Sequence, residues 1–569
     1  MEERNALRPT TAPLSHCQSR VWFLQRIDPS GATYNEAALW RIEGPLDVDA
    51  LRVALDAVAM RQPMLRTRFP TVDGVPRQEV DDVPHTILER VDLSAAGDDA
   101  ERRIESAARE RATRPFDLAE APPIRWTVFS QGRERHALVR VWHHILGDAH
   151  SARLLNDDLA RAYAAAREGA PVELPALALD YVSYSERQAR ELAGPEAAKR
   201  LDDCRARLAG APTLALPTDF RRPAMQSFRG GTVRGRFDSH AVAGLVSAGR
   251  EAGATRYVTF LAAYAALLSR LSGDTDLVVG MPVAARPRPE LAEVVGFFAN
   301  TVACRIDLSG APSTREALRR VHAATRSAID AQQVPFERLV DALGVPRDAS
   351  RNPLFQVAFT MYRRGLSDLA LAGCTVRRRD LDFGSAHFDL MLTLIDGDDG
   401  IGYGWEYCSD LFERATVERM ARQFATLVAA MGREPDRPFS ALPLMDDATR
   451  SRIVASAAGP ATAAPREATI TGRFEAQARA TPSAPAIGTL DYAGLDAAAN
   501  RLAAELHARG VATGAFVAVA CGPVEETAVA WLAVLKAGGA YLPIDPELPA
   551  ERLAYVLEDA KVRHAIADE

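Results

Sequence analysis

The amino-acid sequence predicts a large α/β protein made of more than one compact unit. Its 569 residues exceed the length of one ordinary domain. Segments with the patterns of strands and helices alternate throughout residues 13–440, without the short repeat period of a solenoid. An Ala/Pro-rich stretch at residues 455–466 (ASAAGPATAAPR) then separates this region from a second α/β pattern.

Two helices are expected near the N-terminus. Ser15 and Gln18 form an S-x-x-Q capping-box pattern in front of an apolar run, which marks the start of the first helix. Asp47 is a candidate N-cap for the second helix. Apolar residues follow it at helical spacing on one face: Val48, Leu51, Leu55 and Val58.

The middle of the chain alternates between predicted strands and helices. His136–Trp142 is rich in apolar and β-branched residues and predicts a strand, and a helix is expected to resume from Ser151. Three later segments predict buried strands: Thr275–Val283, Gln356–Tyr362 and Phe388–Ile395.

A new α/β pattern begins at Phe474, after the Ala/Pro-rich stretch, and runs for about a hundred residues. Its predicted helices and strands alternate in the order helix Leu495–Arg509, strand Ala515–Cys521, helix Glu525–Ala537 and strand Tyr541–Ile544.

Composition excludes several classes of protein. The net charge of −7 argues against a nucleic-acid-binding protein, and no apolar run reaches the roughly 18 residues that span a membrane. The N-terminal segment lacks the apolar core of a secretion signal. Six scattered cysteines without a C-x-x-C pair fit reduced thiols. We therefore expect a cytoplasmic protein whose function involves neither nucleic acid nor membrane.

The segment Val141–Ser151 (VWHHILGDAHS) carries the most chemical information. His143 and His144 follow a predicted strand, and Asp148 comes four residues after the second histidine. One alternative is that one histidine packs and the other caps the strand end. Adjacent residues on an extended segment point to opposite faces, so these histidines would not share one metal ion, and we expect no metal site.

This segment resembles the HHxxxDG active-site motif of the condensation domains of non-ribosomal peptide synthetases. The other motifs of that family are matched in the family's order, and together they cover about residues 13–440. They are Leu14–Leu24, Arg61–Phe69, Asp180–Tyr184, Gly296–Arg305, Gln333–Glu337 and Arg347–Leu354. Beyond the linker, Leu490–Leu495 with Asn500–Leu502, and Leu535–Asp545, resemble the first two motifs of adenylation domains.

The resemblance implies two chloramphenicol-acetyltransferase-like lobes that form a V with a central tunnel, followed by a partial α/β adenylation subdomain. A polar break near Gly169–Leu177 suggests where the lobes divide. The expected organisation is an N-lobe at 13–175, a C-lobe at 176–440, a linker at 441–466 and an incomplete adenylation fragment at 467–569.

In this family, donor and acceptor carrier proteins insert phosphopantetheine arms from opposite ends of the tunnel. The α-amine of the acceptor attacks the donor thioester, so the resemblance implies amide-bond formation without a covalently bound cofactor. The chain has no carrier signature and only about a dozen residues before the first motif. We therefore expect the donor carrier to act in trans and the acceptor carrier to lie downstream, in a longer protein of which this chain is a part or as a naturally short product.

His144, the second histidine of the motif, is the expected catalytic residue. An α-amine with a pKa near 8 is about one-tenth free base at pH 7, so a strong base is not needed. General-base help is worth ~10²–10⁴-fold, whereas positioning can supply ~10⁵–10⁸ M of effective concentration. We expect His144 to orient the amine as much as to accept its proton, and His143 to pack or hydrogen-bond beneath the loop.

Asp148 is expected to be structural, because in the family this carboxylate pairs with an arginine and holds the loop. Arg286, at a family-like strand end (VGMPVAARP), is the candidate partner, with a solvated surface arginine as the alternative. The remaining residues expected to support the loop are Gly147, Ala149, Arg66 and Asn300.

Ala149 departs from the family, which has glycine after the aspartate. Glycine allows a positive φ and close approach of the backbone to a ligand, while alanine penalises that conformation. If the N–H at this position stabilises the tetrahedral oxyanion, alanine still supplies the donor. A shifted loop geometry with reduced activity or an unusual substrate is compatible with this alanine, and complete inactivity does not follow.

The adenylation fragment is not expected to make aminoacyl adenylates. The family's phosphate-binding loop, pocket residues and lysine-bearing subdomain would all lie beyond Glu569. Gly538 and Gly539 belong to the second adenylation motif and are expected to be structural.

Four alternatives to amide formation account for part of the sequence. An epimerisation domain shares the HHxxxDG motif, but RDASRNPL and the adenylation start favour condensation; a heterocyclisation domain would carry aspartates in place of the histidines. An acetyltransferase using coenzyme A does not account for the adenylation segment. A catalytically silent docking or gatekeeping module is the alternative from another class, and Ala149 is the residue that favours it. Donor and acceptor identities are not encoded in these motifs.

Overall fold

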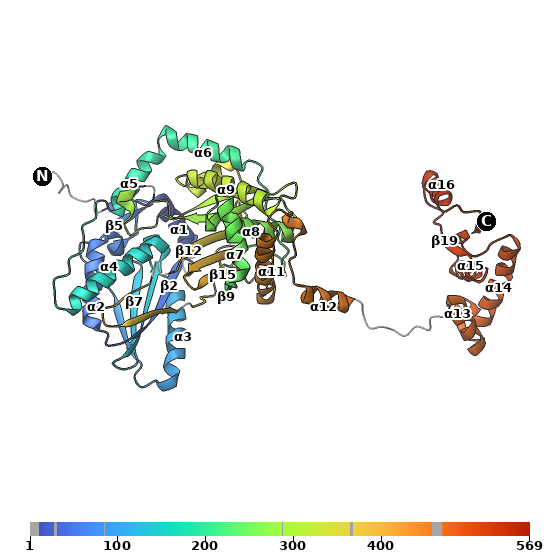
Figure 1. The fold of residues 1–569 in the computed structure, drawn as a ribbon, viewed down its shortest axis with the longest axis horizontal. Helices are drawn as coiled ribbons and strands as arrows, with labels where there is room; N and C mark the ends of the chain where they lie inside the picture. The colour runs from blue at the N-terminus through green and yellow to red at the C-terminus, as the bar shows by residue number, and fades with distance from the viewer. Residues whose placement is uncertain are drawn as a thin grey trace. The chain divides into compact units, whose positions relative to one another are not determined.

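The computed structural model describes residues 11–27, 31–84, 86–286, 288–346, 348–364, 368–379, 381–457 and 469–568. The chain divides into two compact units, Met1–Ser451 and Arg452–Glu569 (Figure 1). Within the described residues, no helix combines the length and the apolar character needed to cross a membrane.

The first half of the larger unit is built on a five-stranded sheet in the order β13-β2-β8-β7-β6. Its strands are β2 (Asn35–Glu43), β6 (Leu88–Asp92), β7 (Ile124–Ser130), β8 (Arg135–His143) and β13 (Thr375–Arg379). Helices α2 (Val48–Arg61) and α4 (Ala149–Arg167) pack against each other, and α3 (Ala100–Thr113) packs against β2 and β8. A small second sheet contains β1 (Thr11–Pro13), β3 (Thr67–Arg68), β4 (Thr71–Val72) and β5 (Val75–Val80).

The second half is built on a six-stranded mixed sheet in the order β11-β10-β12-β14-β15-β9. Its strands are β9 (Gly230–Arg236), β10 (Asp276–Val283), β11 (Asn300–Asp307), β12 (Val357–Arg363), β14 (Leu390–Gly397) and β15 (Gly400–Cys408). Helix α8 (Arg256–Ser272) is buried from Val258 to Ser269. It lies in one apolar core with α7 (Ser239–Glu251), α9 (Thr314–Asp330) and α11 (Arg414–Arg433).

Shorter helices complete the unit. They are α1 (His16–Ile27), α5 (Tyr181–Leu192), α6 (Pro195–Leu208), α10 (Phe336–Leu343), α12 (Asp447–Ala457) and the 3-10 turns η1 (Pro63–Arg66), η2 (Gly97–Asp99), η3 (His144–Leu146), η4 (Pro289–Leu291) and η5 (Phe439–Ala441).

The two halves are interlaced. Strand β13 comes from the second half of the chain but pairs antiparallel with β2 of the first sheet. Leu291, Val294, Val295 and Phe298 likewise pack into the apolar core of the first half. Residues beyond the expected lobe boundary at 175/176 therefore complete the first lobe.

The predicted helix starts agree with the structure. The Ser15 N–H donates to Gln18 Oε1 (3.0 Å), and the Gln18 N–H donates to Ser15 Oγ (3.2 Å), which is a reciprocal capping box. Asp47 caps α2 by accepting from the N–H groups of Asp49 and Ala50. The helix expected from Ser151 begins two residues earlier, at Ala149, because Asp148 is its N-cap.

The smaller unit contains a three-stranded parallel sheet in the order β19-β18-β20. The strands of that sheet are β18 (Phe516–Ala520), β19 (Ala540–Pro543) and β20 (His564–Ala567), and a separate two-stranded sheet pairs β16 (Pro485–Ile487) with β17 (Leu490–Asp491). Its helices are α13 (Ile470–Ala480), α14 (Tyr492–Ala508), α15 (Val524–Lys536) and α16 (Ala550–Asp559). Helix α12 occupies part of the expected linker, and the rest of that prediction, residues 458–466, lies outside the described residues.

Candidate active site

The motif segment forms a tight turn between β8 and α4. Strand β8 ends at His143, the 3-10 turn η3 begins at His144, and Asp148 caps α4. Gly147 has an extended backbone (φ −177°, ψ 176°). A Cβ at this position would lie 2.7 Å from Cη2 of Trp142 and 2.9 Å from Cβ of Ser151. The turn therefore requires glycine here because its neighbours approach too closely for a side chain.

His144 is held in one orientation, with one ring nitrogen left as an acceptor. Its backbone N–H donates to the Tyr34 carbonyl (2.8 Å), and its Nδ1–H donates to the Gly147 carbonyl (2.6 Å). Because a carbonyl can only accept, the neutral ring carries its hydrogen on Nδ1 and a lone pair on Nε2. The Phe297 ring packs against the imidazole with centroids 4.4 Å apart, and the side chain of His144 is 23% exposed.

His143 lies in a different environment from its neighbour. It is fully buried, and its Nδ1 accepts from the Ile145 N–H (3.1 Å). Burial, with a smaller contribution from His144, lowers the pKa of His143 from its usual 6.5 to about 3. The ring is therefore neutral near pH 7 and supports the turn from beneath, as expected from the sequence.

Asp148 ties the turn to the segment that follows β10. Its Oδ1 accepts from the Ser151 N–H (2.8 Å) and from Arg286 Nη2 (3.0 Å). Its Oδ2 accepts from the N–H groups of Phe298 and Ala299, both at 3.2 Å. The Ser151 hydroxyl lies 2.9 Å from Oδ1 as a fifth donor. With these donors on a carboxylate that is 3% exposed, Asp148 is placed to hold the loop.

Arg286 is buried, so the alternative of a solvated surface arginine does not hold. Its side chain is 6% exposed, and its Nη1 donates to the carbonyls of Leu291 (3.3 Å) and Val294 (3.0 Å). The guanidinium lies 3.9 Å from the centroid of the Phe298 ring. Burial lowers the pKa of Arg286, and the charge of Asp148 opposes this shift. The contact between Arg286 and Asp148 that the resemblance implied is present.

Ala149 does not have the positive φ that would penalise an alanine. It is the exposed first residue of α4 and is absent from the described non-glycine residues with positive φ. The expected conformational penalty of alanine is therefore wrong for this turn, since the closely approached position is Gly147.

Arg66 and Asn300 make hydrogen bonds to elements that surround the turn. Arg66 donates from Nε to the Ala59 carbonyl (2.9 Å) and from Nη1 to the Asp81 carbonyl, which joins the end of α2 to the end of β5. Asn300 donates to the carbonyls of Gln332 (3.0 Å) and Val334 (2.8 Å). These bonds position elements around the site, and support of the motif turn by Arg66 and Asn300 stays a prediction.

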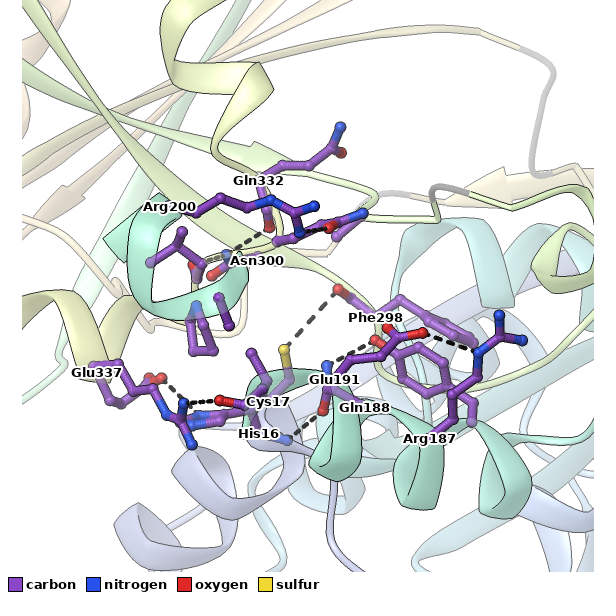
Figure 2. Close-up of a pocket in the computed structure, with 18 of the residues that line it drawn as sticks. His16, Cys17, Arg187, Gln188, Glu191, Arg200, Phe298, Asn300, Gln332 and Glu337 are labelled. Carbon is purple, nitrogen blue, oxygen red and sulfur yellow. Dashed lines mark hydrogen bonds and ion pairs between the residues drawn. The ribbon is translucent and has the colours of Figure 1, made fainter. Parts of the chain in front are cut away.

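A cavity of about 250 Å³ lies on the far side of the Phe297 ring from His144. Its walls come from α1, α5, α6, α10 and the segment around β11, and Figure 2 shows Cys17, Glu337 and Asn300 around it. Phe297 lines this cavity and also packs against His144. The cavity therefore reaches to within one aromatic ring of the motif histidine.

Glu337 on the cavity wall lies against two basic side chains. Glu337 lies 3.5 Å from His16 Nδ1 and 3.4 Å from Arg20 Nε. Burial acts to raise the pKa of Glu337, but the contact with His16 and the charge of Arg20 bring it below its usual value. Burial, helped by the charge of Glu337, raises the pKa of the Cys17 thiol to about 12, so Cys17 is not a thiolate nucleophile near pH 7.

Sequence reasoning missed Glu36, Ser151 and Phe297. Glu36 Oε1 lies 3.3 Å from His144 Nε2, and Ser151 Oγ accepts from Arg286 Nη2 at 2.8 Å. A signal for Glu36 was present, because it is a single acidic residue in the otherwise apolar segment EAALW. Its strand pairing with β8 was not readable from the sequence.

Comparisons with known proteins agree along the whole chain. The family model described as condensation domain matches residues 9–454, and the model described as AMP-binding enzyme matches residues 474–569. Malpinin synthetase from Mortierella alpina is 34% identical over 566 residues, covering 99% of this chain and 7% of that protein. Phosphinothricin tripeptide synthetase PhsB from Streptomyces viridochromogenes is 39% identical over 567 residues, covering 97% of this chain and 48% of that protein. The chain thus spans less than half the length of either relative.

Solved structures share the fold of the larger unit. The X-domain from teicoplanin biosynthesis is 32% identical, with a TM-score of 0.71, and the match covers 77% of this chain and 99% of that one. The first condensation domain of the calcium-dependent antibiotic synthetase, in complex with a substrate analogue, is 20% identical, with a TM-score of 0.66 over 77% of this chain and 100% of that one.

Proposed function

The chain belongs to the condensation-domain family, and we propose that its larger unit forms amide bonds in non-ribosomal peptide biosynthesis. It would transfer a donor acyl or peptidyl group from a carrier-bound thioester to the α-amine of a carrier-bound aminoacyl acceptor. The observation that carries the proposal is the state of His144. Its Nδ1–H is engaged by the Gly147 carbonyl, so Nε2 of the neutral ring is left to accept a proton, and the ring packs against Phe297 of the cavity wall.

The chemistry needs one bond to form and one to break. The amine nitrogen attacks the thioester carbonyl, the C–N bond forms, the C–S bond breaks, and the phosphopantetheine thiol leaves. The nitrogen must also lose a proton, which Nε2 of His144 is placed to accept. Because positioning contributes more than proton transfer, the rigid turn held by Asp148 and Arg286 supports the proposal as much as the base does.

The proposed substrates arrive on phosphopantetheine arms of two carrier proteins that enter a tunnel between the lobes of a V-shaped pair. The cavity beside Phe297 supports this proposal as a route for one arm, since it reaches toward His144 between helices. We also infer a cytoplasmic setting, supported by the six cysteines, which are all free thiols.

We assign no adenylation chemistry to residues 474–569 by themselves. The N–H of Gly538 donates to the Leu535 carbonyl (3.1 Å) and that of Gly539 to the Val534 carbonyl (2.9 Å). Gly538 has φ +86°, the left-handed conformation common after a helix end. These glycine amides therefore cap α15 and are not free to cradle a phosphate.

The first test compares wild type with His144→Ala. A donor-loaded and an aminoacyl-loaded carrier protein are mixed with each, and carrier-bound products are measured by mass spectrometry. We expect amide transfer by wild type and a fall of at least about tenfold in the variant, since general-base catalysis contributes ~10²–10⁴-fold. Carriers that bind without forming an amide on either protein would overturn the proposal and favour a silent docking module.

A further inference from the structure

A carboxylate lies directly against the motif histidine. Strand β2 pairs Glu36 with Trp142 of β8, and the Trp142 indole N–H donates to Glu36 Oε2 (2.7 Å). The second oxygen, Oε1, lies 3.3 Å from His144 Nε2. His144 also donates its backbone N–H to the carbonyl of Tyr34, the residue before β2, so the start of β2 holds both the turn and the carboxylate.

The contact between Glu36 and His144 lacks a proton when the imidazole is neutral. Nε2 then presents a lone pair to a carboxylate oxygen, and two acceptors at this distance repel. The arrangement becomes favourable when a proton lies between the two atoms, or when a cation beside them donates to both. In the described part of the chain, Arg140 and His387 interact with Glu36 electrostatically, but neither makes an ion pair with it.

The other carboxylate in this neighbourhood has its own partner. Glu406 Oε1 accepts from the His387 N–H (3.0 Å), and the His387 ring lies 3.8 Å from the same oxygen. Although burial opposes it, Glu406 raises the pKa of His387. Glu36 is therefore the carboxylate that faces the reacting side of His144, and its side chain is 38% exposed, which leaves it accessible to a ligand.

We propose that Glu36 binds the α-ammonium group of the acceptor beside His144 Nε2, and so selects an amine over an uncharged hydroxyl nucleophile. This inference rests on the proposed amide-forming function. An α-amine with a pKa near 8 is about nine-tenths ammonium at pH 7, so the cationic form is the one that must be bound first. A carboxylate accepting from an ammonium is a charge-assisted hydrogen bond, among the stronger contacts available to a ligand.

The protons balance along this route. The ammonium proton moves to His144 Nε2, and the imidazolium that forms is paired with Glu36. The free amine attacks the thioester carbonyl, and the imidazolium returns its proton to the departing sulfur. The neutral Nε2 then accepts the extra proton from the amide nitrogen, which keeps one hydrogen, and releases that proton to water. The net reaction is ammonium plus thioester giving amide, thiol and one proton.

The test measures binding, so it does not depend on turnover. Carrier proteins loaded with an L-alanyl or an isosteric L-lactyl thioester are titrated against wild type and Glu36→Gln by fluorescence anisotropy. The glutamine keeps an oxygen that can accept from Trp142 but removes the charge. We expect the dissociation constant of the alanyl carrier to rise about tenfold in the variant and that of the lactyl carrier to change less than about threefold.

The matched control is Glu43→Gln, which makes the same charge change at the exposed far end of β2. It should leave the ratio of alanyl to lactyl binding at the wild-type value. An equal change for both carriers in Glu36→Gln, or no change for either, would overturn the inference. Failure of the proposed function itself would be seen separately, as intact alanyl preference in wild type without any amide product.

Discussion

The two motif histidines show how one step along the chain changes the chemistry of a side chain. His143 is the last residue of β8 and points into the core, whereas His144 starts a 3-10 turn and faces the cavity side with Phe297. Burial keeps His143 neutral, and the Gly147 carbonyl sets the tautomer of His144. In the proposed function, identical residue types therefore serve as a structural support and as a proton acceptor.

The depressed pKa of His143 predicts a dependence of stability on pH. An unfolded histidine has a pKa of about 6.5, and in the folded chain burial lowers it to about 3. Between these values the unfolded state binds a proton that the folded state does not, so stability falls as the pH drops below about 6.5. From pH 7.0 to 5.5 this linkage amounts to about 1 kcal/mol.

Urea unfolding of wild type and His143→Gln at these two pH values measures the effect. Wild type should lose about 1 kcal/mol more than the variant between pH 7.0 and 5.5. His240→Gln, at an exposed histidine of α7, serves as the control and should follow wild type. Parallel curves for wild type and His143→Gln would contradict a neutral buried ring.

At the scale of the element, one position of the β8–turn–α4 unit, Gly147, leaves no room for a side chain. Gly147 is enclosed by Trp142 and Ser151, while Ala149 is exposed on the first turn of α4. The hydrogen bond that orients His144 also ends on the Gly147 carbonyl. The geometry of the site therefore depends on glycine at 147 and tolerates a methyl group at 149.

Opposite substitutions at these neighbouring positions test this view. Gly147→Ala introduces a Cβ at 2.7 Å from the Trp142 ring, so we expect a loss of about 1–3 kcal/mol of stability. Amide transfer should fall at least about tenfold, because displacement of the turn misplaces His144. Ala149→Gly should cost at most about 1 kcal/mol and change transfer less than about threefold. A large gain in transfer by Ala149→Gly would show that the alanine limits the site.

At the scale of the whole larger unit, the site is assembled from parts that lie far apart in sequence. The cavity draws its walls from α1, α5, α6, α10 and the residues before β11. Hydrogen bonds join Asp148 to Arg286 and to the segment around Phe298. Strand β13 crosses back to complete the first sheet. Interlacing of this kind lets the two halves hold one cavity at a fixed distance from His144.

Filling the cavity tests whether it carries a substrate arm. Ala197 of α6 lines it, whereas Lys199 of the same helix is exposed and does not. In Ala197→Phe the KM for a carrier-bound substrate should rise by about tenfold, with a smaller effect on kcat, because binding is obstructed more than chemistry. Lys199→Phe should behave as wild type. Unchanged kinetics in Ala197→Phe would place the arm elsewhere.

Local patterns in the sequence were sufficient for much of the fold. The capping residues Ser15, Gln18 and Asp47, the strand predicted at His136–Trp142 and the alternation after Phe474 all correspond to elements of the structure. Such features depend on neighbours within a few residues, so they can be read without knowing the tertiary fold. The family motifs also identified the family, because the condensation-domain model matches residues 9–454.

The sequence by itself determined the element pattern, the family and the identity of the motif residues His143, His144, Gly147 and Asp148. Only the tertiary structure decided that Gly147 rather than residue 149 is sterically constrained, that His143 is neutral, and that Glu36 meets His144. The physical reason is that burial, close approach and cross-strand contact are set by residues distant in sequence. Glu36 and His144 are 108 positions apart in number and 3.3 Å apart in space.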